Sequence, residues 1–285
     1  MKTTQNIKAG KADILIKWLM FTAAITGLAL LSAYYPIQAN IPFIVIPSIL
    51  VLLLAKPVFF ERLKLTTLLT MRIVIVFAAL GLFNPQVYVD LIMLALIVNI
   101  LEATFTDLLR YKKYFNAVSG FVLAIAVVTL RGVWQFDAPF GQYYLAEGEF
   151  PAVTWCFVIA YTIWNWIFVT NEFSDSVALM HVGFLLAPIF GSICTWELGA
   201  FGGIGMWLLL RANSLAIGGW MQISAKGWFE REFHSERFAR FVLWTKQTKV
   251  QLILMLINLL LMGCGLYLTF ANSGIRFTWS PFFLS

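Results

Sequence analysis

The sequence predicts an all-α, polytopic transmembrane helix bundle of about nine spans, with the N-terminus in the cytoplasm and the C-terminus outside. Long apolar stretches recur along the whole chain, and basic residues cluster in every second gap between them. The composition agrees, with 61% hydrophobic residues, 12% charged residues and a mean hydropathy of +0.84. A soluble domain is nearer half apolar and a quarter charged.

The length of each stretch fits a membrane span. A hydrocarbon core about 30 Å thick needs roughly 20 apolar residues in a helix that rises about 1.5 Å per residue. The stretches that meet this requirement are 12–34, 41–60, 66–84, 88–109, 115–134, 150–171, 175–195, 198–222 and 250–271. No gap is long enough for a soluble domain, so we expect residues 1–285 to form a single transmembrane domain.

Three of these spans have features of their own. The first begins with lysines like a signal peptide, but its apolar run exceeds the roughly 7–15 residues of a signal h-region, which favours a retained anchor. Prolines flank or enter the second span and are expected to kink it or set its ends; they are Pro36, Pro42, Pro47 and Pro57. The eighth span is rich in glycine, which favours close helix packing.

The distribution of Lys and Arg predicts the orientation, because cytoplasmic loops carry the excess. Seventeen of the 20 basic residues lie on one side, in the N-terminus and in the second, fourth and eighth gaps or their edges, and this count includes Arg72. The surplus also predicts contact with anionic lipid headgroups rather than with nucleic acid. We therefore expect a multi-pass protein of a bacterial inner membrane, with the lipid bilayer as its partner.

The longest inner loop, 224–249, has helical character. Glu236 and Arg240 stand four residues apart, and aromatic residues such as Trp228, Phe241 and Trp244 accompany them. One interpretation is a helix that lies in the cytoplasmic membrane interface. The other is a structured connector between two spans.

Polar residues inside the spans point to a site. A charge at the bilayer centre costs about 2.5–3.5 kcal/mol on insertion scales, so such residues are expected to face a partner or a cavity. Counting along each span places them at one level, in the cytoplasmic half of the bundle. The predicted polar layer contains Asn99, Glu102, Asn165, His181, Arg211, Asn213 and Asn258. Glu102 and Arg211 could form an ion pair, and this layer could either bind a solute or hold the helices together.

The sixth span adds an aromatic cluster. Trp164 and Trp166 precede Glu172 and Asp175, an acidic turn on an otherwise basic side. Aromatic faces beside carboxylates suit a cationic or heteroaromatic solute. The alternative is an aromatic surface that faces lipid and neighbouring helices.

A weak internal repeat relates two helical hairpins. Asn99 and Thr104 recur at the same spacing as Asn165 and Thr170. The segment that begins at Gly120 is then echoed by the one that begins at Gly183. Both hairpins run in the same direction, so the repeat would be parallel, as in some transporters. Chance similarity among apolar sequences is the alternative.

Metal chemistry has little support, and the sequence does not identify a cofactor. Glu172, Asp175 and His181 could supply ligands, but a hydrolytic zinc site usually needs two or three His or Cys, and the chain has two histidines. No phosphate-binding glycine loop, HExxH or GxSxG motif occurs. The three cysteines are scattered through apolar spans and are expected to be small core residues.

The stretch NILEATFTDLLRYKKYFNAVSGF, followed by YTIWNWIFV, resembles an uncharacterised family of bacterial polytopic membrane proteins. This resemblance covers roughly the central third of the chain, and it implies no activity.

The first functional hypothesis is a permease for a small polar solute, either cationic or heteroaromatic. Its substrate-binding residues would be Asn99, Glu102, Trp164, Asn165, Trp166, Glu172, Asp175, His181, Arg211 and Asn213. The alternatives are an enzyme that acts on lipid or isoprenoid groups, with Glu172, Asp175 and His181 as reactive groups, and a non-catalytic scaffold subunit. The sequence is also compatible with a homo-oligomer.

Overall fold

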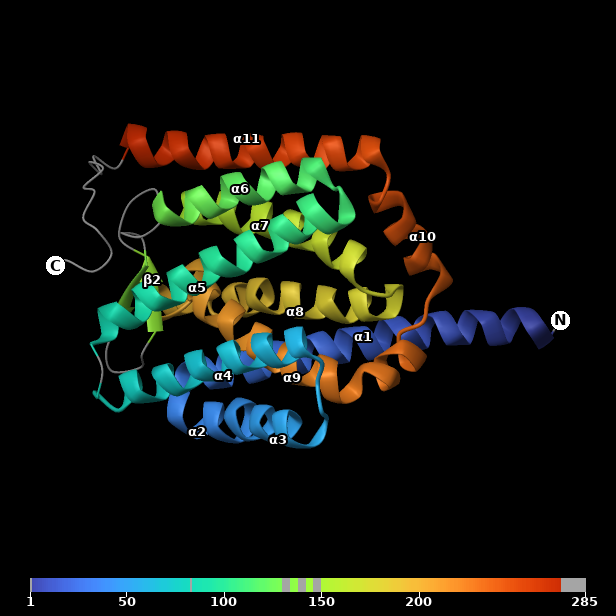
Figure 1. Ribbon diagram of the computed structural model, residues 1–285, viewed down its shortest axis with the longest axis horizontal. Coiled ribbons are helices and arrows are strands. Elements are labelled where there is room, and N and C mark those ends of the chain that lie inside the picture. Colours follow the sequence, from blue (N-terminus) through green and yellow to red (C-terminus); the bar gives the residue numbers. More distant parts are fainter. Residues whose placement is uncertain (1, 83, 130–133, 138–141, 146–149, 273–285) are drawn as a thin grey trace.

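The fold is an all-helical bundle with one short β-ribbon (Figure 1). The structure is a computed structural model, and it describes residues 2–82, 84–129, 134–137, 142–145 and 150–272. Its α-helices are α1 (Lys2–Tyr34), α2 (Pro36–Asn40), α3 (Ile46–Leu54), α4 (Phe59–Ala79), α5 (Pro85–Thr106), α6 (Tyr114–Thr129), α7 (Phe150–Glu172), α8 (Asp175–Cys194), α9 (Trp207–Glu232), α10 (Glu236–Thr245) and α11 (Thr248–Asn272). The shorter elements are the π-helical turns η1 (Ile41–Val45) and η2 (Asp107–Tyr111), the 3₁₀ turns η3 (Trp196–Phe201) and η4 (Gly203–Met206), and the strands β1 (Trp134–Asp137) and β2 (Gln142–Leu145).

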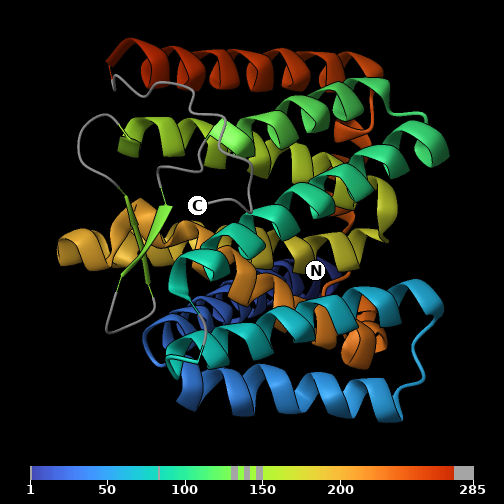
Figure 2. The same ribbon diagram turned by 60° about the vertical axis from the view of Figure 1, so that its left-hand side comes forward.

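The long helices lie side by side, with α11 on one edge of the bundle and α2 and α3 on the opposite edge (Figures 1 and 2). The helix α10 lies at one end, which we call the α10 end, and α1 begins there. The antiparallel pair β1–β2 lies at the other end, which we call the ribbon end, and α11 terminates there. Helices α7 and α8 are the most buried of the candidate membrane spans and form the centre.

Within the described residues, six helical segments are long and apolar enough to cross a membrane. They are Asp13–Tyr34, Pro36–Leu54, Asp90–Tyr111, Ala152–Glu172, Asp175–Cys194 and Thr248–Thr269. A shorter apolar helix covers Tyr114–Val127. The helices α4 and α9 overlap the predicted spans 66–84 and 198–222 with shifted bounds, and they carry charged residues such as Lys64 and Arg211. The chain therefore has the character of a multi-pass membrane protein.

Large apolar side chains cover the outside of the bundle. Leu54 on α3, Ile125 on α6 and Leu260 on α11 are each 68–76% exposed. Such extensive apolar surface is rare on soluble monomers and marks a surface that contacts lipid or another protein. The outer faces of these helices are thus suited to the bilayer.

The prolines shape the second predicted span as expected. Pro36 occupies the first turn of α2, and Pro42 lies in the π-helical turn η1 that joins α2 to α3. A proline has no backbone N–H, so it interrupts the regular hydrogen-bond ladder. The helical segment runs over Pro36–Leu54 rather than over the predicted 41–60.

The eighth predicted span, 198–222, differs from expectation at its start. Residues Trp196–Met206 form the 3₁₀ turns η3 and η4, and the α-helix begins only at Trp207. Gly202 explains the break, since a Cβ there would lie 2.0 Å from the carbonyl oxygen of Thr195. Gly203 adds a φ of +64°, which side chains rarely adopt.

The segment 224–249 is largely helical. Helix α9 continues to Glu232, and Ser235 caps α10 by accepting a hydrogen bond from the Phe238 amide at 3.4 Å. On α10, Phe241 and Trp244 are each 47% exposed, whereas Phe233 at the end of α9 is buried. The segment therefore combines exposed rings on α10 with a buried ring after α9, and its position in a membrane interface stays a prediction.

The environments of Arg72 and of the cysteines differ from those that the sequence predicted. Arg72, counted at the edge of the second gap, is 1% exposed within α4 and donates a hydrogen bond to Asn213. Cys194 and Cys264 are exposed rather than in the core, and Cys156 is partly buried. Burial of Arg72 depends on which face of α4 meets α9, and composition does not report that face.

Candidate functional site

A cavity of about 690 Å³ lies between α4, α5, α7, α8 and α9. Its polar and charged wall consists of Glu61, Lys64, Asn99, Glu102, Thr106, Arg110, Asn165, Glu172, His181, Arg211 and Gln222. The apolar wall includes the rings of Phe105, Phe168, Phe173 and Phe184. A cavity of this size suits a small organic molecule.

Chain direction brings these residues together. The first turn of α4, the last turns of α5 and α7, the first turns of α8 and the later turns of α9 all lie toward the α10 end (Figure 1). Consecutive antiparallel helices therefore contribute wall residues from far apart in the sequence. Glu61 also fixes the start of α4, because its carboxylate accepts a hydrogen bond from the Val58 amide at 3.2 Å.

Glu102 and Arg211 both line the cavity, but they do not form the expected ion pair. Among the described residues, the pairs within 4.0 Å are Lys17 with Asp13, Lys17 with Glu232, and Arg110 with Glu172. Glu102 is exposed to the cavity space, whereas Arg211 is 5% exposed. The carboxylate of Glu102 is thus available to a ligand.

Tyr161 and the backbone of α8 hold Arg211 in place. Its Nε donates to the Tyr161 hydroxyl at 3.3 Å, and Nη1 donates to the Phe184 carbonyl at 3.4 Å. The guanidinium carbon also lies 5.6 Å from the centre of the Tyr161 ring, within cation–π range. Two neutral acceptors leave the positive charge of Arg211 without a close carboxylate.

Lys64 is the second cation of the inner wall. It projects from α4 and interacts electrostatically with the carboxylates of Glu102 and Glu172 and with the guanidinium of Arg211. None of these partners forms an ion pair with Lys64 within 4.0 Å in the described part of the chain. The wall thus presents separated charges of both signs.

Glu172 closes one side of the cavity toward the loop between α5 and α6. It accepts a hydrogen bond from the Tyr111 hydroxyl, and a carboxylate oxygen lies 3.9 Å from Nη1 of Arg110. Tyr111 and Arg110 both belong to η2. The turn η2 therefore fixes the position of a carboxylate on the neighbouring helix.

His181 lies on the α8 wall. A ring nitrogen pairs with the Gln222 side-chain oxygen at 3.0 Å, which requires that nitrogen to carry a proton. The imidazole stacks on Phe173 with a centroid distance of 4.5 Å and an angle of 11°. These two contacts orient the ring across α8 and α9.

A cluster of buried rings lies beyond Arg211 toward the ribbon end. This aromatic cluster consists of Phe157, Tyr161, Trp164 and Trp207, each at most 1% exposed. Tyr161 lies 5.3 Å from Trp207 and 5.7 Å from Trp164 between ring centroids. The cluster contacts the cavity wall through the hydrogen bond between Tyr161 and Arg211.

Six of the ten predicted site residues line the cavity: Asn99, Glu102, Asn165, Glu172, His181 and Arg211. The other four lie off its wall. Trp164 belongs to the aromatic cluster, and Asp175 lies in the first turn of α8. Trp166 stacks on Phe241 of α10 at 5.5 Å, and the buried Asn213 donates to the Ala29 carbonyl at 3.0 Å. Counting along a span predicts a depth for each residue, but it does not predict the direction in which the side chain points.

Sequence reasoning missed several wall residues. Lys64 and Arg110 had been counted as loop cations, and Gln222 lies at the last position of a predicted span. Phe168 and Phe173 provide aromatic surface that was expected from Trp164 and Trp166. A signal was present for Lys64, because it stands eight residues before Arg72 on the same polar side of α4.

The proposed internal repeat stays a prediction. Asn99 and Asn165 do occupy the same cavity. The related glycines differ, since a Cβ on Gly120 would meet Thr104 Oγ1 at 1.9 Å, whereas Gly183 faces Phe21 of α1 at 3.0 Å.

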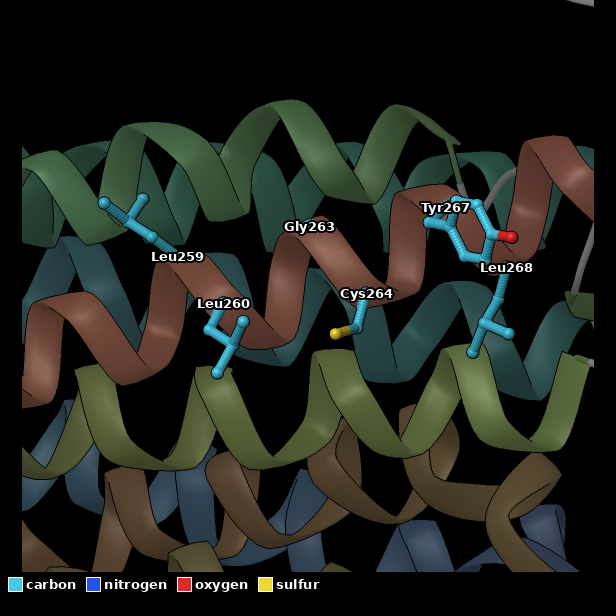
Figure 3. Close-up of a pocket in the computed structure, with 6 residues that line it drawn as sticks. All are labelled: Leu259, Leu260, Gly263, Cys264, Tyr267 and Leu268. Carbon is cyan, nitrogen blue, oxygen red and sulfur yellow. The ribbon is translucent and has the colours of Figure 1, made fainter.

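A second cavity, of about 460 Å³, is a groove on the surface of α11 (Figure 3). Its lining comes from α11 alone and is almost wholly apolar: Leu259, Leu260, Gly263, Cys264, Tyr267 and Leu268. This groove lies on the face suited to lipid, and it has no charged group that could select a polar solute.

No group of three or more His, Cys, Asp or Glu side chains in the described residues could hold a metal ion. The main cavity provides charges of both signs, amides and rings. No protein-family model matches the chain, and comparison with curated proteins and with solved structures gives no match either. The cavity itself is the basis for a functional assignment.

Proposed function

We propose that the protein is a permease for a small polar solute, with the cavity between α4, α5, α7, α8 and α9 as its binding site. The observation that carries this proposal is the convergence of Asn99, Glu102, Asn165 and Arg211, from three separate helices, on one cavity of about 690 Å³. Charges at membrane depth are costly, and a solute pathway is a common reason for retaining them.

The character of the wall favours a solute with a cationic or heteroaromatic group. Glu102 offers a carboxylate without a close cation, and Phe168 and Phe173 offer rings on the same wall. A cation held by a carboxylate and an aromatic face gains both Coulomb and cation–π attraction. Lys64 and Arg211 would bind an acidic group on the same solute.

The membrane topology of the proposal has nine spans in a bacterial inner membrane, with the α10 end in the cytoplasm. Each predicted span contains helical residues in the structure, and α1 starts at the opposite end from the end of α11 (Figure 1). Basic residues flank the helices at the α10 end, as the excess of cytoplasmic Lys and Arg requires.

Alternating access would then involve the aromatic cluster. In the state described here, Tyr161 and Trp207 lie between the cavity and the ribbon end. Transport requires these rings to separate while the cavity closes toward the α10 end. Rocking of one group of helices against another is a common way to achieve this.

Two-sided chemical access to the cavity tests the proposal without knowledge of the solute. The three native cysteines are replaced by alanine, Asn99→Cys is introduced, and oriented membrane vesicles are treated with a membrane-impermeant thiosulfonate from one side or the other. A permease predicts rapid modification from the α10 side and slower modification from the ribbon side. Modification from one side alone, under all conditions, would contradict transport through this cavity.

Leu260→Cys provides the matched control. Leu260 is 68% exposed on the apolar face of α11, where lipid rather than water would surround a thiol. Because the reagent reacts with the thiolate, this variant should stay unmodified from either side. Reaction at Leu260→Cys would show that the helix faces water and would remove α11 from the proposed bilayer boundary.

A further inference from the structure

A buried carboxylate lies behind the cavity wall. Asp107 is 0% exposed and begins the π-helical turn η2. One of its oxygens accepts a hydrogen bond from Nδ2 of Asn116 at 2.6 Å, and that same amide also donates to the Trp164 carbonyl at 3.2 Å. Asn116 is itself 1% exposed, so both polar groups are removed from solvent.

Two oxygens of this cluster have no hydrogen-bond partner: Oδ1 of Asp107 and Oδ1 of Asn116. Because Asn116 Nδ2 holds the carboxylate through Oδ2, the second oxygen of each side chain lies in the same buried cluster. A buried acceptor without a partner is unfavourable in a dry interior, and the nearby Nδ2 of Asn171 is also unpaired. A bound cation would satisfy both oxygens.

The negative charge of Asp107 also favours a bound cation. No ion pair within 4.0 Å involves Asp107 in the described part of the chain. The charged and titratable groups that act on it are Lys113 in the following loop, Glu172 on α7 and Tyr111 in its own turn. An isolated buried carboxylate is strongly disfavoured unless a proton or another cation neutralises it.

We propose that Asp107 and Asn116 form a buried site for one monovalent cation, either a proton or a sodium ion. A proton on Oδ1 of Asp107 would give this oxygen a hydrogen to donate to Oδ1 of Asn116. A sodium ion would instead be coordinated by both oxygens, in keeping with its preference for hard ligands. Asn171, whose amide lies beside the carboxyl without a well-formed hydrogen bond, completes the cluster.

The site is linked to the cavity through Glu172. Asn171 and Glu172 are consecutive on α7, and the negative charge of Glu172 repels that of Asp107. Neutralisation of Asp107 relieves this repulsion, so cation binding and the charge state of the cavity wall must influence each other. This link to the cavity rests on the proposed permease function, in which the bound cation would be the ion whose movement is coupled to solute transport.

The site is tested on the full chain in lipid nanodiscs, without any solute. Infrared difference spectra between acidic and alkaline buffer report a protonated carboxyl group, and thermal unfolding in sodium chloride against choline chloride reports sodium binding. Because the other Asp and Glu side chains also titrate, the diagnostic infrared signal is a carboxyl band that is present in the wild type and missing from Asp107→Asn. The wild type should show either this band or the sodium-dependent rise in melting temperature, and Asp107→Asn should lack it. The spectral signal identifies the proton, and the sodium-dependent rise in melting temperature identifies the ion.

Asp13→Asn is the matched control, because the Asp13 side chain is exposed and pairs with Lys17. It should retain the wild-type signal. Should Asp107→Asn fail to fold, Asn116→Ala removes one ligand oxygen and should weaken the sodium response about tenfold or shift the carboxyl band. The absence of both signals in the wild type, or their retention in Asp107→Asn, would overturn the cation site. The proposed permease function would still be tested separately, by labelling of Asn99→Cys from both sides of the membrane.

Discussion

The two ends of the bundle handle polar groups in different ways. At the α10 end, Glu102, Lys64 and Glu172 face a cavity, and no ion pair within 4.0 Å joins Lys64 to either carboxylate in the described residues. Toward the ribbon end, Tyr161 and Trp207 pack ring against ring and are each only 1% exposed. The difference indicates a division between the two ends: the packed rings toward the ribbon end stabilise the fold, and the cavity at the α10 end is suited to binding a ligand.

The largest effect is expected toward the ribbon end, from Trp207→Ala. Removing a buried indole leaves a cavity between Phe157 and Tyr161, and such truncations cost about 3–5 kcal/mol in the free energy of unfolding. Thermal unfolding in detergent would measure the loss. Trp228→Ala, at a ring that is 47% exposed near the α10 end, should cost much less. Equal losses in the two variants would contradict the division.

A second, smaller effect concerns the break before α9. Gly202→Ala places a methyl group against the Thr195 carbonyl, and this backbone group cannot move aside easily. We expect a loss of about 1–3 kcal/mol, again from thermal unfolding. The matched change is Gly263→Ala on α11, where nothing lies within 4 Å of the added carbon. Its melting temperature should stay at or rise above the wild-type value, because alanine favours a helix more than glycine does, and a comparable fall would contradict the clash as the cause.

The smallest effect on stability is expected at the α10 end. Glu102→Gln keeps the shape of the side chain and removes a charge that faces the cavity, so unfolding should change by less than about 0.5 kcal/mol. Under the proposed function, the same variant should lose most of its uptake of a cationic solute into proteoliposomes. Full uptake would remove Glu102 from the site, and a large loss of stability would show that it holds the helices together.

The sequence allowed much of the helical framework to be predicted, because long apolar runs have few alternatives. The depth of Asn99, Asn165 and Arg211 could likewise be counted from the span ends, and these residues share one cavity. Rotation about each helix axis could not be predicted. Trp164 and Trp166 are two residues apart, so they point to different sides of α7. In the structure, Trp164 contacts Tyr161 and Trp166 contacts Phe241.

Residues near the span ends were the hardest to interpret. Asp107 is followed closely by Arg110, Lys112 and Lys113, and this charged sequence is typical of a solvated loop. The π-helical turn η2 instead directs Asp107 inward and Arg110 outward. A local change of helix type carries no clear signature in composition, and this explains why the buried carboxylate was not anticipated.

Helix α9 has a mechanical consequence. It is a single helix of 26 residues, about 39 Å long, from Trp207 in the aromatic cluster to Glu232 beyond the cavity. If α9 rotates by roughly 10° about Trp207, its C-terminal end moves by about 7 Å. Glu232 forms an ion pair with Lys17 of α1, with 2.9 Å between the Lys17 Nζ and the Glu232 Oε2. A rotation of α9 must therefore either move α1 with it or break this ion pair.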